Sequence, residues 1–422
     1  MRYIIVLLAV FILNSCSTVN SIEQKLKQDN EKHSYFDGLV LYNPKTKKEI
    51  LNHNGAKYFT PASNTKLFTF YTAYKTFNSE TSRLKSLAYY RTHDSLVIKG
   101  TADPTFLYGF ESAEVLDFLK KASNNIYVLD ANIDESTYGS GWAWDDYPYY
   151  YMPEKSLFPI YGNILKYNFS EGRQQSTPHY FKTQISTVDS VLVSRKHNEN
   201  QFFAQKNRQK GYEVPFRTSN QLVVDLLSDK LHKNVTLIPN RKGLNFKYIY
   251  NQNTDSIYKQ MLTVSDNFIA EQLLLQVGQE VSGTYSVNAA IKYSLENYLN
   301  DLPQEPRWVD GSGLSRYNLF TPESLVKLLE KMYQEIPTQK LLNYFPVGGE
   351  SGTLKGVYKV KDKPYIYAKT GTLSNNHCLS GYLITKKGTF LIFSYMNNHY
   401  KVSSKEIKAT MEKTLLQIYN RY

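Results

Sequence analysis

One short segment, Pro61–Tyr71, restricts what this chain can form more than any other. Its apolar positions follow helical spacing, and Pro61 stands where a helix can begin. Residues three apart on a helix share a face, so Ser63 and Lys66 would lie side by side. A serine becomes a nucleophile when an adjacent amine can take its proton, so the segment predicts a helix with an activated serine. The pattern is common, and it also begins at Ser82, Ser256 and Ser324.

Two further motifs lie downstream in the chain. Ser265-Asp266-Asn267 stands at the predicted start of a helix, and Lys369-Thr370-Gly371-Thr372 ends a predicted strand. Alone, Ser265 is typical of a helix N-cap and Lys369 of a solvated strand edge. In the order Ser-x-x-Lys, Ser-Asp-Asn, Lys-Thr-Gly, the three form the motif set of the penicillin-recognising serine enzymes.

The residue types fit acyl transfer. Ser63 needs a neutral amine from Lys66, and a second cation such as Lys369 would lower the pKa of that amine. Ser265 can pass a proton to the leaving amine, and Asn267 can hold both the substrate amide and Lys66. We therefore predict that these five residues are catalytic.

The third motif also suits substrate binding. Gly371 would let the substrate backbone lie close against the strand, because it has no side chain. Lys369, Thr370 and Thr372 are suited to hold a terminal carboxylate.

Further segments extend the match to one branch of these enzymes. Between about Gly38 and Asn397 the chain resembles the type-4 penicillin-binding proteins, of low molecular mass and class C. The resemblance implies an α+β fold, like that of penicillin-binding proteins and serine β-lactamases, with an antiparallel sheet flanked by helices and a mainly β inserted domain. The segments that carry it, beside the three motifs, are Gly100–Thr105, Gly141–Asp146, Ser265–Glu271, Asp310–Arg316 and Pro346–Leu354.

The resemblance also implies the activity. It implies a D-Ala-D-Ala carboxypeptidase or endopeptidase that acts on peptidoglycan peptides through an acyl-enzyme on Ser63, with β-lactams as inhibitors and no cofactor. It further implies an oxyanion hole from the backbone N–H groups of Ser63 and Thr372. Asp146 and Arg316 fall where the family binds the charged side chain of a stem peptide, with Asp145 as the alternative to Asp146.

Two places depart from the family pattern. Gly100-Thr101-Ala102-Asp103 stands where Gly-x-Gly-Asp is usual, and Asn375-Asn376-His377-Cys378 is an unusual continuation of Lys-Thr-Gly. These departures bear on substrate preference more than on reaction type.

The N-terminus reads as an export signal. Residues 1–15 hold one positive charge, an apolar run and small residues, which is typical of a secretory signal and too short for a membrane span. Leu13-Asn14-Ser15-Cys16 resembles a bacterial lipobox, which implies lipidation of Cys16. Residues 16–33 are polar and predict a tether or a short helix. We expect an exported, periplasmic lipoprotein anchored to the membrane.

The rest of the chain divides into three parts by pattern. Residues 34–100 begin with a strand, turn and strand and form the first part of a transpeptidase-like domain. Residues 101–250, with short strands and aromatic clusters, form the inserted domain. Residues 251–422 form the second part, in which strands near both chain ends suggest one shared antiparallel sheet. Its predicted elements are helices over 322–333 and 404–419 and strands over 365–369, 379–384 and 389–395.

Other functions fit the sequence less well. The net charge of +12 suits an anionic surface, but no nucleic-acid-binding motif accompanies it. The eight histidines are scattered without metal-ligand spacing, and Gly-x-Ser-x-Gly is absent. Two alternatives stay open, a β-lactamase or esterase on the same fold and a non-enzymatic lipoprotein that binds cell wall.

Overall fold

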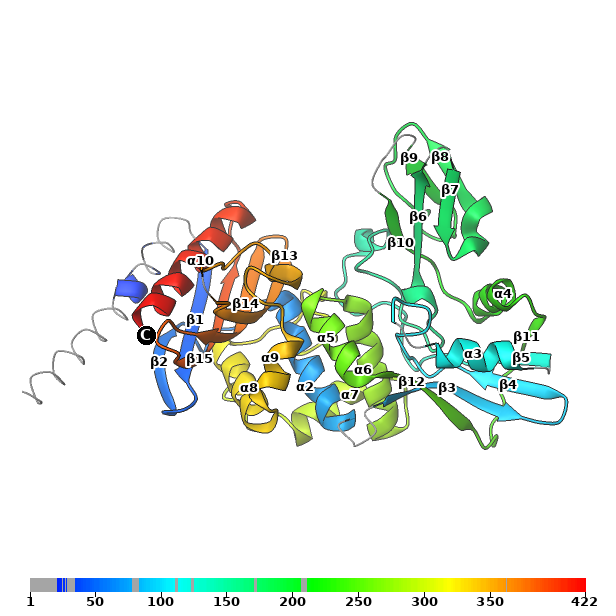
Figure 1. Cartoon of the computed structure of the whole chain (residues 1–422), viewed down its shortest axis with the longest axis horizontal. Helices are drawn as coiled ribbons and strands as arrows, with labels where there is room; N and C mark the ends of the chain where they lie inside the picture. Colours follow the sequence, from blue (N-terminus) through cyan, green and yellow to red (C-terminus); the bar gives the residue numbers. More distant parts are fainter. Residues whose placement is uncertain are drawn as a thin grey trace, which may run out of the picture.

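The chain folds into two lobes that lie side by side (Figure 1). The computed structural model describes residues 21–24, 26, 28, 35–77, 83–110, 113–122, 125–170, 173–205, 211–361 and 363–422. The predicted signal peptide and Cys16 therefore lie outside the described residues.

The first lobe is built on a five-stranded antiparallel sheet. The first strand along the chain pairs with the last one, which confirms that segments near both chain ends complete one sheet. Its strand order is β13 (Ile366–Leu373), β14 (Asn376–Ile384), β15 (Phe390–Asn398), β1 (Phe36–Asn43) and β2 (Lys48–His53).

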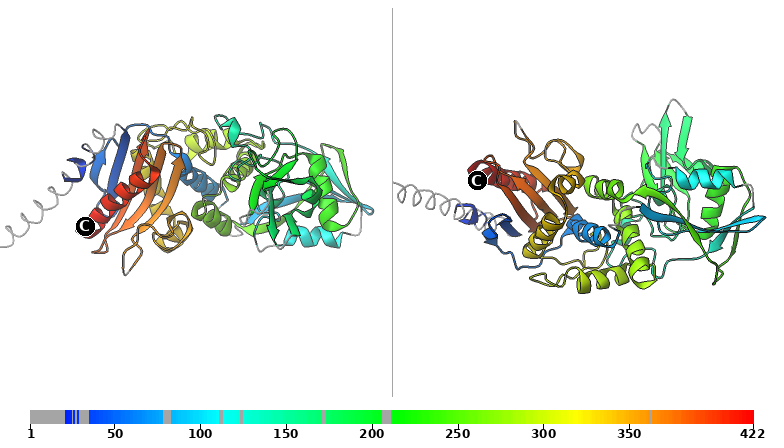
Figure 2. Two further views of the ribbon diagram at one scale, coloured as in Figure 1. Left: turned by 90° about the horizontal axis from the view of Figure 1, so that it is seen from above. Right: turned by 60° about the horizontal axis from the view of Figure 1, so that its bottom comes forward.

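Helices cover both faces of this sheet (Figure 2). Successive side chains of a strand point to opposite faces. Accordingly, Leu39 and Leu41 of β1 pack in the cluster that holds α10 (Ser404–Arg421), whereas Val40 packs on the other face with α2 (Thr65–Phe77) and α8 (Pro322–Glu335). Four further helices that the structure describes in this lobe are α5 (Thr254–Thr263), α6 (Asn267–Ser282), α7 (Val287–Asn297) and α9 (Thr338–Tyr344).

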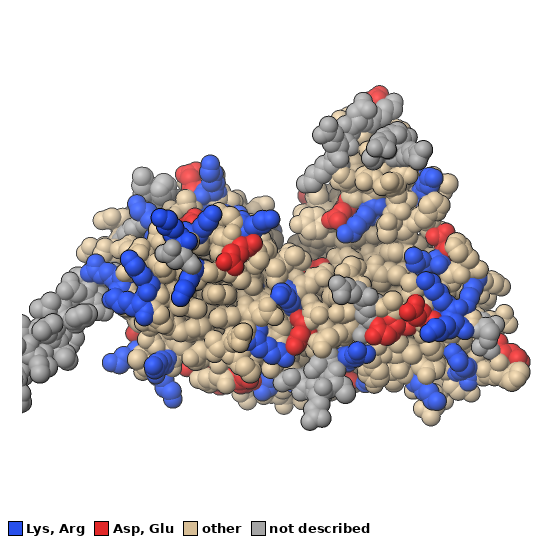
Figure 3. Space-filling model, in the orientation of Figure 1, with Lys and Arg blue, Asp and Glu red and all other residues tan. Residues whose placement is uncertain are grey.

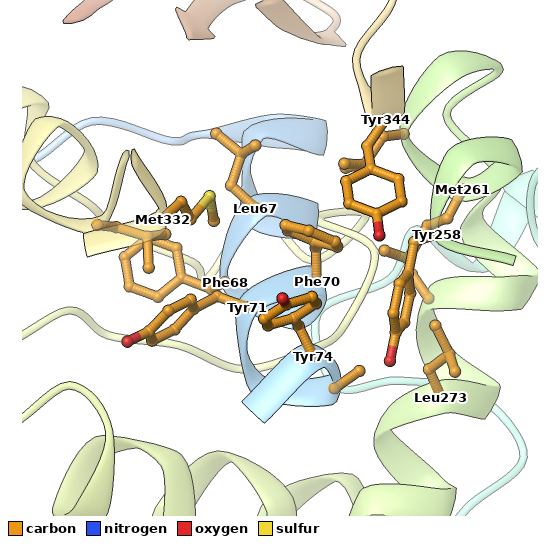
Figure 4. Packing of buried hydrophobic residues seen from close by; sticks show 14 of the residues in the cluster. Leu67, Phe68, Phe70, Tyr71, Tyr74, Tyr258, Met261, Leu273, Met332 and Tyr344 are labelled. Atoms are coloured by element: carbon orange, nitrogen blue, oxygen red, sulfur yellow. The ribbon is translucent and has the colours of Figure 1, made fainter. Parts of the chain in front are cut away.

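Helix α2 lies at the centre of the first lobe. Its residues from Thr65 to Tyr74 are all buried, so every side of this part of the helix packs inside the lobe. Figure 4 shows Phe70 between the helix axis and the rings of Tyr258 and Tyr344, which lie 5.3 and 5.1 Å from it. This packing fixes the N-terminal end of α2, where the predicted nucleophile stands.

The second lobe is mainly β, as predicted. It holds a five-stranded mixed sheet, a three-stranded sheet, a two-stranded pair and the helices α3 (Glu114–Lys121) and α4 (Asn220–Leu231). The mixed sheet has the order β11 (Val235–Pro239), β5 (Asn125–Asp130), β4 (Ser95–Lys99), β3 (Arg83–Arg91) and β12 (Lys247–Asn253). The smaller sheets are β10 (Tyr212–Pro215), β6 (Ile164–Ser170) and β7 (Arg173–Thr177), then β8 (Ile185–Val188) and β9 (Phe202–Gln205).

The first boundary of this lobe differs from the prediction. The sequence placed the boundary at residue 100/101, after β4. In the structure β3 pairs with β12 and β4 pairs with β5, so both strands belong to the mixed sheet of the second lobe. The partner of β3 lies more than 150 residues further along the chain, and the local pattern of residues 83–99 could not show that pairing.

The described part of the segment 16–33 is more than a tether. Residues 21–24, 26 and 28 are helical. Ile22 and Leu26, four residues apart, are buried in the cluster that also holds Ile407, Met411 and Leu415 of α10. The sequence predicted either a tether or a short helix for this segment, and the described residues form a helix.

Candidate active site

The three motifs line one side of a cleft between the lobes. The cleft has a volume of about 1340 Å³, and residues of both lobes line it. From the first lobe come Ser63, Ser265, Asn267, Arg316, Thr370 and Thr372. From the second come Asp145, Asp146, Tyr150, Tyr151, Lys166 and Glu213.

Ser63 lies in a short 3₁₀ turn, Ala62–Asn64, that leads directly into α2. The turn is held against the sheet, because Asn64 Nδ2 donates to the backbone oxygen of Lys369 in β13 (3.1 Å). Lys66 Nζ donates to Ser63 Oγ at 3.0 Å, which confirms the predicted contact one helical turn apart. Ser63 is thus only partly covered, while the Lys66 amine is buried.

The Lys66 amine has two more acceptors. It donates to Asn267 Oδ1 and to the backbone oxygen of Ser312, both at 2.6 Å. An ammonium group has three N–H donors, and here each one has an oxygen acceptor. The first and second motifs are therefore brought together as predicted, whereas the Ser312 carbonyl was not foreseen.

Two buried carboxylates shape the loop that supplies this carbonyl. Glu271 accepts the backbone N–H of Gly311 (3.2 Å) and of Ser312 (2.7 Å). Asp310 accepts the backbone N–H of Gly313 (2.8 Å). Gly313 has φ of +80°, and a Cβ there would lie 1.9 Å from the backbone oxygen of Ala62, so the loop can touch the Ser63 turn only with glycine at this position.

The second motif differs in detail from the prediction. Asp266, and not Ser265, is the N-cap of α6, with its Oδ1 accepting the N–H of Ile269 (3.0 Å). Ser265 precedes the cap with φ of +64°. Asn267 is held from the other side, because its Nδ2 donates to the backbone oxygen of Tyr151 (2.7 Å).

The third motif brings a second amine to the site. Lys369 Nζ donates to Ser265 Oγ (2.8 Å) and to the backbone oxygen of Thr370 (2.7 Å). Thr370 Oγ1 donates to Thr353 Oγ1 (2.8 Å), and Thr353 also lines the cleft.

His377 stands in the unusual segment after Lys-Thr-Gly. It faces Thr372 across the β13–β14 pair, with Nδ1 2.8 Å from Thr372 Oγ1. Burial lowers the pKa of His377 to about 3, and the charges of Lys408 and Lys369 act in the same direction. The neutral imidazole of His377 therefore holds the hydroxyl of the exposed Thr372 side chain in place. No sequence signal indicated this role.

Gly371 is needed for a different reason from the one predicted. A Cβ at this position would lie 2.4 Å from the backbone oxygen of Pro61 and 2.9 Å from Asn64 Nδ2. The glycine thus lets β13 approach the turn that carries Ser63. In the structure the close neighbour is the protein's own backbone.

Burial lowers the pKa of Lys66 to about 8, while the negative charges of Asp310 and Glu271 oppose this change. The pKa of Lys369 falls well below its usual range, first because of burial and then because of the charge of Lys66. The sequence analysis attributed the lowered pKa of Lys66 to Lys369. The structure assigns it to burial, and the repulsion between the amines acts on Lys369.

The two predicted specificity residues both line the cleft. Asp146 is half-buried, and its Oδ1 accepts the Tyr151 hydroxyl (2.8 Å). The Arg316 side chain is exposed and forms no ion pair with the described part of the chain. Asp145, the alternative, is exposed in the same cleft.

These residues lie on segments that hold each other. Trp142 Nε1 donates to Asp310 Oδ2 (2.9 Å), and the backbone N–H of Arg316 donates to Gly141 O (3.4 Å). The same carboxylate therefore supports the loop behind Lys66 and the wall of the cleft.

No metal site accompanies this arrangement. Within the described ranges, no group of three or more His, Cys, Asp and Glu side chains lies close enough to hold an ion. Cys378 is buried, and burial raises the pKa of its thiol to about 12, so it takes no part in the cleft chemistry.

A serine with a buried lysine partner, a second Ser–Lys pair and an antiparallel sheet between helices define the class of penicillin-recognising serine enzymes. The chain belongs to the D-Ala-D-Ala carboxypeptidase 3 (S13) family, whose model matches residues 18–232 and 252–418. The prediction of a type-4 penicillin-binding protein with D-Ala-D-Ala carboxypeptidase activity is confirmed at this level. The non-enzymatic alternative is correspondingly disfavoured.

Several relatives are similar over nearly the whole chain. The D-alanyl-D-alanine carboxypeptidase DacB of Haemophilus influenzae is 23% identical, covering 92% of this chain and 90% of that protein. The D-alanyl-D-alanine carboxypeptidase of Actinomadura is 24% identical, covering 86% and 77%. The crystal structure of penicillin binding protein 4 from Haemophilus influenzae has a TM-score of 0.75 at 20% identity and covers 95% of this chain and 98% of that one, which shows a shared fold.

The first prediction concerns pH. Because Lys66 accepts a proton only when neutral, acylation by penicillin should speed up as pH rises through about 8. Burial is the main cause of that value, so Lys369→Met should leave the midpoint within about one pH unit. Stopped-flow acylation rates over a pH series measure this. A midpoint that moves up by about two units, toward the free-lysine value of about 10.4, would instead restore the role first given to Lys369.

The second prediction concerns the close approach at Gly371. Gly371→Ala should slow acylation of Ser63 at least about tenfold, because backbone atoms of the Ser63 turn must move to admit the Cβ. Gly381→Ala is the matched control, since its Cβ would meet the Tyr367 backbone oxygen at 2.3 Å in the same sheet, away from Ser63. Both variants should melt earlier, but only Gly371→Ala should acylate slowly. Equal rates in the two would contradict this account.

Proposed function

We propose that the chain hydrolyses the D-Ala–D-Ala bond of peptidoglycan stem peptides through an acyl-enzyme on Ser63. The observation that supports this proposal most directly is the buried Lys66 amine, whose three acceptors include Ser63 Oγ at 3.0 Å. Membership of the D-Ala-D-Ala carboxypeptidase 3 family supports the same bond as substrate.

The proposed reaction has two steps. In the first, Ser63 Oγ attacks the carbonyl carbon between the two alanines while its proton passes to Lys66. Backbone N–H groups of Ser63 and Thr372 are proposed to stabilise the oxyanion, and one such donor is worth about 3 kcal/mol. The C–N bond then breaks, and the leaving D-Ala amine takes a proton through Ser265, which Lys369 contacts at 2.8 Å. In the second step water attacks the ester and releases the shortened peptide.

The third motif is suited to the terminal carboxylate of the substrate. Thr370 and Thr372 line the cleft next to Lys369, and each hydroxyl can turn its one O–H from its present neighbour, Thr353 or His377, to a carboxylate. Asn267 keeps Lys66 in place through Oδ1, while one hydrogen of its Nδ2 stays available for a substrate amide.

Substitution of Ser63 and the lifetime of the label distinguish a penicillin-inhibited peptidase from the alternative functions. Ser63→Ala should abolish covalent labelling by fluorescent penicillin, because only Ser63 combines a contacting lysine with the other two motifs. Ser256→Ala is the control, since Ser256 also begins Ser-x-x-Lys and is exposed. Mass mapping of the labelled peptide identifies the acylated residue. Label that persists for hours indicates a penicillin-inhibited peptidase, whereas rapid loss of label with penicillin hydrolysis would indicate a β-lactamase.

We further propose that Asp146 and Arg316 recognise the charged side chain of the stem peptide, whose amine would pair with Asp146 and whose carboxylate with Arg316. Both line the cleft, Asp146 from the second lobe and Arg316 from the first, and the described neighbours leave the Arg316 guanidinium without an ion pair. A charge-assisted contact contributes roughly 1.5–3 kcal/mol.

This assignment predicts a substrate-dependent loss. Asp146→Ala and Arg316→Ala should each slow cleavage of a peptidoglycan-mimetic peptide about ten- to a hundredfold. Penicillin acylation should change much less, because penicillin lacks that side chain. Asp145→Ala is the control and should have little effect on either substrate. Equal losses on both substrates would show that the two residues support the site's structure instead.

We also propose export and anchoring through a lipid on Cys16. The support is the apolar leader and the lipobox-like sequence before Cys16. Among the described residues, no helix is both long and apolar enough to cross a membrane.

The anchor has a direct test. Cys16→Ala should leave penicillin labelling intact and move the protein from the washed membrane fraction to the soluble fraction in high salt, because the acyl chains are lost. Cys378→Ala, at the other cysteine, should stay in the membrane fraction. Retention of Cys16→Ala under the same wash would point to another anchor.

A further inference from the structure

The positive charge of this chain is concentrated near its C-terminus. Residues 355–422 carry 12 Lys and Arg against 3 Asp and Glu, a net charge of +9, whereas residues 1–354 carry 38 against 35, a net charge of +3. The catalytic Lys369 is the one buried lysine of that region. Most of the excess charge therefore lies on the surface of the first lobe.

Three neighbouring elements form this surface, which we call the basic face. They are the outer side of α10, the segment 355–361 and the β14–β15 turn at Lys386 and Lys387. The Tyr358 N–H donates to Glu412 Oε1 (2.6 Å), which joins the segment to the middle of α10. The Lys386 N–H donates to Tyr419 O (2.9 Å), which joins the turn to the end of α10. Figure 3 shows Lys and Arg gathered over this part of the lobe.

The acidic residues of α10 scarcely offset this charge. Glu406 forms the capping box with Ser403, and Glu412 accepts the Tyr358 N–H. The exposed Lys386, Lys408 and Lys413 form no ion pair with any residue that the structure describes. The face therefore presents free cations to an external partner.

Two apolar side chains stand among these lysines. Leu416 on α10 and Val357 in the segment are each 36% exposed. Basic residues around apolar ones are the pattern of surfaces that lie at a lipid headgroup layer.

The N-terminal segment leaves the fold beside this face. Ile22 and Leu26 are buried in one cluster with Ile407, Met411 and Leu415 of α10. Between Cys16 and Ser21 there are five residue steps, which span at most about 18 Å. An anchor on Cys16 would therefore hold α10 within reach of the membrane.

We propose that the basic face docks on anionic lipid headgroups and orients the enzyme on its membrane. Charge complementarity and the position of the N-terminal segment favour a lipid surface over an anionic wall polymer. Ser404, in the first turn of α10, lines the cleft, so docking along α10 sets the direction in which the cleft opens. The inference rests on the proposed export, and it is independent of the catalytic assignment.

The test uses the mature chain with Cys16→Ser, which carries no lipid, so that only the basic face can bind. Its co-sedimentation with vesicles of phosphatidylglycerol and phosphatidylcholine is compared with vesicles of phosphatidylcholine alone. Lys359→Gln, Lys386→Gln and Lys413→Gln are combined, one from each element. The control combines Lys120→Gln, Lys230→Gln and Lys242→Gln, which are exposed residues of the second lobe with the same change in net charge.

We expect binding to the anionic vesicles only, and weaker binding at high salt. Each basic residue near an anionic membrane changes partitioning about fivefold, so the basic-face variant should lose roughly a hundredfold and the control little. Penicillin labelling of all variants checks that they are folded.

Three outcomes would overturn the proposal. These are no binding to anionic vesicles, equal binding to neutral ones, or an equal loss in the control variant. Binding to soluble poly(glycerol phosphate) without binding to vesicles would identify a wall polymer as the partner and also reject the lipid surface. A failed Cys16 anchor would not affect any of these measurements.

Discussion

The active site depends on the buried amine of Lys66, in which every N–H group has an oxygen acceptor. Lys66 Nζ donates to Ser63, which we propose as the nucleophile, to Asn267 of the second motif and to the Ser312 carbonyl. A buried cation that loses a partner costs several kcal/mol, so the positions of all three acceptors are coupled to it. The amine that we propose to activate Ser63 thereby also holds together three segments that are far apart in the sequence.

The surroundings of this amine set its pKa, on which its proposed role as a base depends. Burial lowers the pKa of Lys66, and the carboxylates of Glu271 and Asp310 limit the change. Those carboxylates bind backbone N–H groups of the loop that supplies Ser312 O. They therefore set both the loop's shape and the amine's proton affinity, and a substitution there would alter the two together.

The second lobe takes part in the same network. Trp142 donates to Asp310, Tyr151 O accepts from Asn267, and Gln272 of α6 donates to the Ala102 oxygen (3.1 Å). Ala102 has φ of +60°, which explains why glycine is usual at this position in the family that the sequence resembles. The departure at Ala102 therefore affects how Gly100–Asp103 packs on α6. Ala102 is not among the residues that line the cleft.

The sequence by itself determined the three motifs and their order, the class of enzyme and many elements of the first lobe. Hydrophobic period and caps are local, so α8 with its Thr321 cap and α10 match their predicted ranges closely. Tertiary structure decided which distant strands pair, as with β3 and β12, and which backbone atoms meet. The role of Gly371 against Pro61, the Ser312 carbonyl on Lys66 and the support of Thr372 by His377 all depend on such contacts. Backbone carbonyls and close approaches carry no residue signature, so only the folded chain shows them.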